Sequence, residues 1–93
     1  MSCIMYMGIA ADEQVYDVSV GFDRLTNKYH IMAEGADPCA APVVDGLVGQ
    51  AQTAVTMLLE KGIPVPAGLL RVLNEHKAQH VGNKIVRLAA VHA

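Results

Sequence analysis

Apolar and polar residues alternate most regularly over residues 15–22, where the apolar positions are Tyr16, Val18, Val20 and Phe22. A period of two is typical of a β-strand that packs one face on the core and turns the other toward water or a partner. Residues 3–9 are apolar on both faces, which predicts a buried strand. Residues 11–14 then form the turn between the two strands.

Residues 28–34 alternate as well. Tyr29, Ile31 and Ala33 lie on one side of the segment, and His30 and Met32 lie on the other. A short helix over residues 24–34 is the alternative, since Asp23 would cap it and Gly35 would end it. The segment is rich in Thr, Asn, Tyr, His and Ile, which are mediocre helix formers, so we predict a third strand.

Residues 44–59 carry apolar side chains at spacings of three and four, which is the pattern of an amphipathic helix. The apolar stripe consists of Val44, Leu47, Val48, Ala51, Val55, Leu58 and Leu59. Pro42 suits the first turn of such a helix, and Gly62 suits the left-handed position just past its end. We therefore predict one long helix here.

A second helix is predicted after residues 63–66. These residues are expected to be extended, because a proline disfavours the helical conformation at the residue before it. Pro66 suits the start of the new helix. Its apolar stripe consists of Leu69, Leu70, Leu73, His76, His80 and Val81, and Gly82 and Asn83 end it.

Residues 85–91 form either a last strand or a continuation of the second helix, and the β-branched Ile85, Val86 and Val91 favour the strand. The whole pattern predicts a single α+β domain over residues 1–93, in the order β-β-β-α-α-β. We expect a small antiparallel sheet with both helices packed on one face. A chain of 93 residues is long enough for one such domain and too short for two.

Composition predicts an apolar surface. Hydrophobic residues make up 53% of the chain and charged residues only 17%, against about 25% in an average soluble domain. This composition excludes a disordered chain, and no apolar run approaches the roughly 18 residues of a membrane span. Because few charged side chains cover the surface, we expect a homo-oligomer. The candidate contacts are residues 3–9, the non-core face of residues 15–22, and the helix face around Gly46 and Gly49.

The net charge of −2 is divided unevenly along the chain. Residues 1–46 carry seven acids and two bases, whereas residues 47–93 carry two acids and five bases. This asymmetry would suit head-to-tail contact between protomers or a partner at each end. We favour the alternative, chance with a few internal ion pairs, because surface ion pairs are weak. Arg71, Lys77, Lys84 and Arg87 are too dispersed for the clustered basic face of a nucleic-acid-binding protein. Nucleic acid is therefore not the expected partner.

A metal site is suggested by His76 and His80, because their spacing of four residues puts both rings on one helix face. Such a pair can hold Zn²⁺, with Cys39 or His30 completing the site. The HExxH motif of zinc proteases is missing, since Lys77 follows the first histidine. We favour the alternative, in which two half-buried histidines finish an apolar stripe, and predict no metal and no other cofactor.

The chain contains no recognisable catalytic motif. No serine or cysteine lies in a known nucleophile motif, and the glycine spacings of nucleotide-binding loops are missing, so we predict no catalytic residues and no enzymatic activity. Cys3 and Cys39 are too few for a disulfide scaffold. The first eleven residues lack the basic region of a signal peptide, so the expected location is the cytoplasm.

Two short segments resemble known families. Residues 34–41 (EGADPCAA) resemble the passage from a strand into a long helix in some small phage-encoded anti-CRISPR proteins. Residues 58–66 (LLEKGIPVP) resemble the helix exit of HicB-type antitoxins, whose β-β-β-α-β order is similar although their turn pattern is not found here. Both families act by occluding another macromolecule without catalysis, and no functional residue carries over.

We therefore expect an oligomeric, non-enzymatic interaction protein that binds and blocks or modulates a partner protein, as inhibitors of phage or mobile-element type do. One alternative is an antitoxin-like or regulatory module that contacts nucleic acid through its basic C-terminal end. The other is a small metal-binding or ligand-binding domain that uses His76 and His80.

Overall fold

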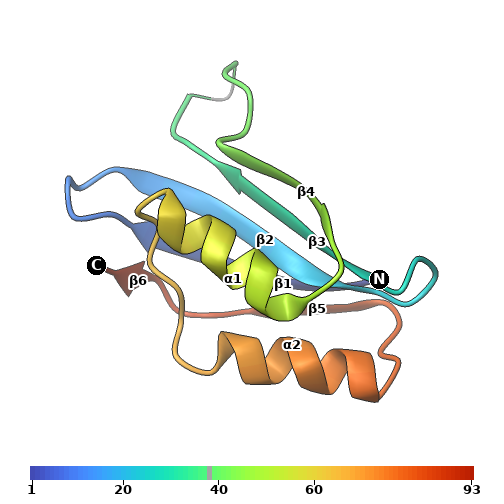
Figure 1. Ribbon diagram of the computed structural model, residues 1–93. Helices are drawn as coiled ribbons and strands as arrows, with labels where there is room; N and C mark the ends of the chain where they lie inside the picture. Colours follow the sequence, from blue (N-terminus) through green and yellow to red (C-terminus); the bar gives the residue numbers. More distant parts are fainter. Residues whose placement is uncertain (38) are drawn as a thin grey trace.

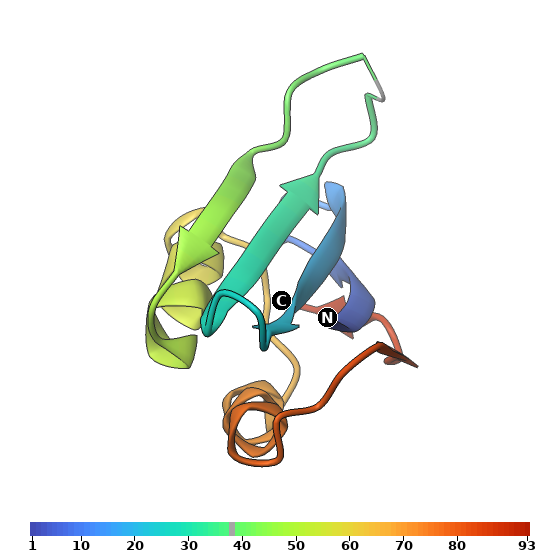
Figure 2. The same cartoon turned by 90° about the vertical axis from the view of Figure 1, so that its right-hand side faces the viewer.

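The computed structural model describes residues 1–37 and 39–93, and this part of the chain forms a six-stranded sheet and two helices (Figure 1). The elements are β1 (Ser2–Ile9), β2 (Val15–Asp23), β3 (Lys28–Glu34), β4 (Val44–Val48), α1 (Ala51–Glu60), α2 (Leu69–Ala78), β5 (Lys84–Arg87) and β6 (Val91–His92). Both helices contribute to one buried cluster on the same side of the sheet, and Figure 2 shows this side from a second direction. The predicted α+β class is confirmed.

The strands are ordered β4-β3-β2-β1-β5, and β6 also pairs with β1. Strands β1 to β4 are antiparallel to their neighbours, whereas β5 and β6 run parallel to β1. The sheet is therefore mixed rather than antiparallel throughout. The reason lies in the connection: a parallel neighbour needs a long crossover, and the segment with α1 and α2 supplies one before β5 returns beside β1.

The first three strands follow the predicted alternation. Between β2 and β3, the Asp23 carboxylate accepts hydrogen bonds from the Leu25 backbone N–H and the Thr26 hydroxyl, and Asn27 adopts a positive φ of 56°. These are the features of a tight turn. The strand over residues 28–34 is confirmed, and the alternative helix over residues 24–34 is wrong.

The long helix predicted over residues 44–59 is wrong in its first half. Residues 44–48 form β4, which pairs with β3, and the helix begins only at Ala51. Gly46 and Gly49 each disfavour a helix by about 1 kcal/mol, and Pro42 precedes a strand. Val44 on the sheet and Ala51, Val55 and Leu58 on the helix do share one core, but Leu47 and Leu59 of the predicted stripe are each 56% exposed.

This correction also changes the segment over residues 34–41. It leads from β3 toward β4 and not into a helix, and Pro38 lies outside the described residues. In both views the described residues next to the ends of β3 and β4 lead away from the body of the molecule (Figures 1 and 2).

The ends of α1 and α2 depend on two glycines. Gly62 has a φ of 75° just past α1, as predicted, and the backbone N–H of the buried Ile63 then donates to the Leu58 carbonyl. Gly68, with a φ of 83°, precedes α2, so this helix starts after the predicted Pro66. It also ends at Ala78, before the predicted stop. Residues 85–91 contain strand segments in β5 and β6, as predicted, separated by residues 88–90.

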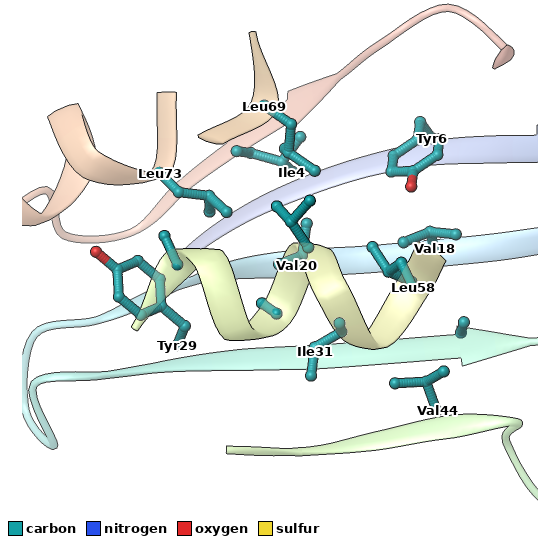
Figure 3. Packing of buried hydrophobic residues seen from close by; sticks show 14 of the residues in the cluster. Ile4, Tyr6, Val18, Val20, Tyr29, Ile31, Val44, Leu58, Leu69 and Leu73 are labelled. Carbon is teal, nitrogen blue, oxygen red and sulfur yellow. The ribbon is translucent and has the colours of Figure 1, made fainter. Parts of the chain in front are cut away.

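The core lies between the sheet and the two helices (Figure 3). Ile4, Val20 and Ile31 from three adjacent strands meet Leu58 of α1 and Leu73 of α2, and all five are at most 1% exposed. The strand β1 was expected to be buried on both faces. It is buried only on this one, because both helices pack on the same side of the sheet.

Candidate partner-binding face

The side of the sheet that faces away from α1 and α2 is rich in apolar side chains, and we call it the open face. Strand β1 alternates between the buried Ile4 and Tyr6 and the more accessible positions between them. The sheet register extends this accessible side across the other strands. Its apolar members are Cys3, Met5, Met7, Ile9, Val15, Met32, Leu47 and Ile85.

Several of these side chains are strongly exposed. Met7 is 46% exposed, Leu47 56% and Ile85 68%. An antiparallel sheet with one covered face normally presents polar residues on the other. A contiguous apolar surface of this kind is characteristic of an interaction site.

Charged residues lie at defined positions on the open face. Asp17 of β2 is paired with Glu34 of β3 in the sheet register, so two acids are direct neighbours. Asp45 lies on β4 at one edge, and Arg87 lies on β5 at the other. Among residues 1–37 and 39–93, none of these four side chains has an ion-pair partner. Adjacent like charges destabilise a sheet, so this acidic pair is costly to an isolated chain.

An open hollow of about 540 Å³ lies over β1 and β2 on this face. Met5 and Met7 line it together with Arg87, and the acidic pair Asp17 and Glu34 also borders it. It therefore combines an apolar lining with acidic and basic borders, a combination that suits a docking surface better than a closed ligand pocket.

The other end of the open face is held by hydrogen bonds. His30 on β3 donates its Nε2–H to the Ser2 carbonyl oxygen at 2.8 Å, because a carbonyl can only accept. The Cys3 thiol lies 3.0 Å from the Ser19 hydroxyl. Gly21 lies beneath, and a methyl group there would overlap the Ser2 carbonyl oxygen. This corner of the face is thus a rigid part of the sheet.

A serine–histidine pair lies on the covered side of the sheet. The Ser2 Oγ is 3.1 Å from His76 Nδ1 and accepts a hydrogen bond from the Phe22 backbone N–H at 2.9 Å. Ser2 is 0% exposed and His76 only 6%. Burial, reinforced by the charge of Lys84, lowers the pKa of His76 below its ordinary value of 6.5, although Glu75 acts in the opposite direction. The pair is sealed from solvent, so it joins elements and offers no surface to a substrate.

The structure does not bring together the residues of the alternative zinc site. His76 is buried on α2, whereas His80 lies beyond the end of that helix, exposed and with a φ of 48°. Cys39 is exposed in the β3–β4 connection, and His30 lies on the open face. Over residues 1–37 and 39–93, no three His, Cys, Asp or Glu side chains gather as metal ligands would.

The basic residues of the C-terminal half are also dispersed. Arg71 on α2 pairs with Glu75 at 2.8 Å. Lys84 is beside Ser2 on the covered side of the sheet, whereas Arg87 is beside Met5 on the open face. The two basic residues of β5 thus lie on opposite sides of the sheet.

The sequence identified part of the open face. Residues 3–9 and the non-core face of residues 15–22 were expected contacts, and the structure places both there. Gly46 and Gly49 were expected on a helix, and Gly46 lies on β4 instead. Leu47 and Ile85 were not expected on this face, because only the pairing of β4 with β3 and of β5 with β1 brings them to it.

Known proteins provide no template for this face. Comparisons with protein-family models, curated proteins and solved structures found no match for the chain. Within the part of the chain that the structure describes, no helix has the length and apolar character needed to cross a membrane. The function is therefore inferred from the residues of the chain itself.

Proposed function

We propose that the chain is a non-enzymatic interaction protein that binds and blocks or modulates a partner protein through its open face. The apolar strip that runs from the exposed Ile85 across the partly buried Met5 and Met32 to the exposed Leu47 carries this proposal. Removing such side chains from water contributes about 25 cal/mol for each Å² of apolar surface that is buried. A partner that covers the strip therefore gains affinity from residues that contribute little to the fold.

The charges on the same face support a protein partner. Asp17 and Glu34 are costly neighbours in the free chain, and a basic side chain from a partner would relieve their repulsion. Interfaces commonly combine an apolar centre with a charged rim of this kind. We include an oligomer in the proposal, with self-association and partner binding sharing one surface.

The experiment is affinity capture from the native host with two matched variants. Met32→Glu puts a charge into the centre of the open face, and Leu25→Glu puts the same charge on the 89% exposed side chain of the β2–β3 turn. We expect wild type and Leu25→Glu to recover the same specific protein. Met32→Glu should bind it at least about tenfold more weakly, because a central interface position is changed.

Thermal unfolding of both variants shows whether they remain folded. Equal recovery by all three folded proteins would contradict the proposal, because the open face would then not be the binding surface.

A further inference from the structure

Strand β2 lies at the centre of the path β4-β3-β2-β1-β5, so the open face has two strands on either side of it. The register aligns one row of side chains across all five strands: Arg87, Met5, Ser19, Met32 and Asp45. Two residues away along the strands, Ile85 lies at the β5 edge and Leu47 at the β4 edge. The two edges thus carry matching apolar residues and opposite charges.

We propose that a second copy of this chain covers the open face when no partner is bound, packed face to face about a two-fold axis parallel to β2. This inference deepens the proposed function, because it names an occupant of the same surface. The rotation places the β5 edge of one protomer over the β4 edge of the other. Arg87 then meets Asp45 of the partner subunit, Ile85 meets Leu47 of the partner subunit, and Met5 meets Met32 of the partner subunit.

The charges select this axis over the other simple arrangement. The alternative is a two-fold axis that lies in the interface perpendicular to the strands. If it ran along the row of Arg87 and Asp45, each of these residues would stack on its own copy. If it ran between this row and the next, Arg87 would meet Ile85 of the partner subunit and Asp45 would meet Leu47 of the partner subunit. Like charges in contact cost several kcal/mol, and a buried charge without a partner is also costly. The axis along β2 makes two Arg–Asp pairs from groups that have no ion-pair partner among the described residues of one chain.

Side-chain size along the axis also suits this packing. Ser19 and Gly21 of the central strand are small, and Met5 and Met32 flank them. Small residues at the centre leave room for the methionines of both copies to interdigitate. Methionine is unbranched and flexible, so it fills such irregular space well. Asp17 lies on β2, so the axis sets it against its own copy, and Glu34 meets Met7 of the partner subunit. The two Arg–Asp pairs outweigh this single repulsion, and Asp17→Asn should therefore strengthen the dimer.

The open face is close to the lower size limit of standard interfaces, about 600 Å² on each partner. Five strands about 4.8 Å apart and about seven residues long give a face of roughly 24 by 24 Å. This projection of roughly 600 Å² underestimates the accessible area of protruding side chains, and a standard interface buries about 800 Å² on each partner.

The test is charge reversal measured by sedimentation of the purified full chain. We expect the wild type to dimerise, and Arg87→Glu and Asp45→Lys each to weaken the dimer at least about tenfold by creating like-charge or unpaired contacts. The double variant should recover to within a few-fold of wild type. Arg71→Glu, which makes the same charge change on α2, should leave the dimer unchanged.

A wild type that remains monomeric at its highest soluble concentration overturns the inference, as does a double variant no stronger than the single variants. These outcomes are separate from partner capture, since only purified protein is used. A monomer that still captures a partner through Met32 overturns self-association alone. A dimer whose wild type and Met32→Glu variant recover the same proteins overturns the proposed function alone.

Discussion

Ser2 is held from both sides of the sheet by two histidines. His30 donates to its carbonyl oxygen on the open face, and His76 contacts its hydroxyl on the covered side. The hydroxyl also joins β1 to β2 through the Phe22 backbone. Buried polar groups need such partners, because an unsatisfied one costs about 1–3 kcal/mol. These two histidines therefore hold the chain in place, and the sequence alone gave no sign that they share a residue near the start of β1.

The depressed pKa of His76 makes stability depend on pH. Because the folded chain holds its proton less tightly than the unfolded chain, acid favours unfolding. The stabilising contribution is complete well above pH 6.5 and decreases as the pH falls through 6.5 toward the lower pKa of the folded state. The Ala93 carbonyl and Glu13 raise the pKa of His92, which acts in the opposite direction, so the measurement uses His92→Gln as the background. In that background we expect urea unfolding to show a lower free energy at about pH 5.5 than at about pH 7.5.

His76→Gln should be less stable at neutral pH, through loss of the Ser2 contact, and should have a shallower pH dependence than wild type. The control is His80→Gln, which changes an exposed residue and should keep the wild-type slope. If the free energy of unfolding of His76→Gln depended on pH as steeply as that of wild type, His76 would be ruled out as the source of the pH dependence.

The elements show how far a hydrophobic pattern alone can predict this fold. The strands over residues 15–22 and 28–34 were predictable because alternation and turn chemistry agree there. Residues 44–48 were not, because Val44 and Leu47 fit a helical stripe as well as a strand. What decides the outcome is the hydrogen-bonded edge of β3, which accepts another strand. The parallel direction of β5 is likewise set by tertiary contact with β1.

The close approach of β1 to β2 at Gly21 gives a test at the level of these elements. Gly21→Ala puts a methyl group onto the Ser2 carbonyl oxygen and 2.7 Å from His30 Nε2. We expect a loss of at least about 1–3 kcal/mol in the free energy of unfolding, as in other overpacked sites. Chemical denaturation measures it.

Gly46→Ala on β4 is the matched control, because nothing lies within 4 Å of the added methyl group. Its effect should lie between zero and a gain of about 1 kcal/mol, since alanine restricts the unfolded chain. Equal losses of stability in both variants would show that the overlap with the Ser2 carbonyl oxygen is not what destabilises Gly21→Ala.

For the molecule as a whole, the surface composition was predictable and its layout was not. The low charge content predicted an apolar surface, whereas the uneven division of charge was interpreted as chance. Only the sheet order places Asp45 and Arg87 at opposite edges of one face, with the methionines between them. The favoured interpretation of His76 and His80 as two half-buried histidines on one helix is wrong for His80, because the helix ends at Ala78 and leaves His80 exposed.

Methionine oxidation footprinting of the purified wild type, at low and at high protein concentration, tests the central role of the open face most directly. Met5, Met7 and Met32 report on that face, and Met57 on α1 is the internal reference. We expect the three open-face methionines to oxidise more slowly at high concentration while Met57 is unchanged. If the oxidation rates of all four methionines were independent of protein concentration, or if Met57 alone were protected, self-association through the open face would be contradicted.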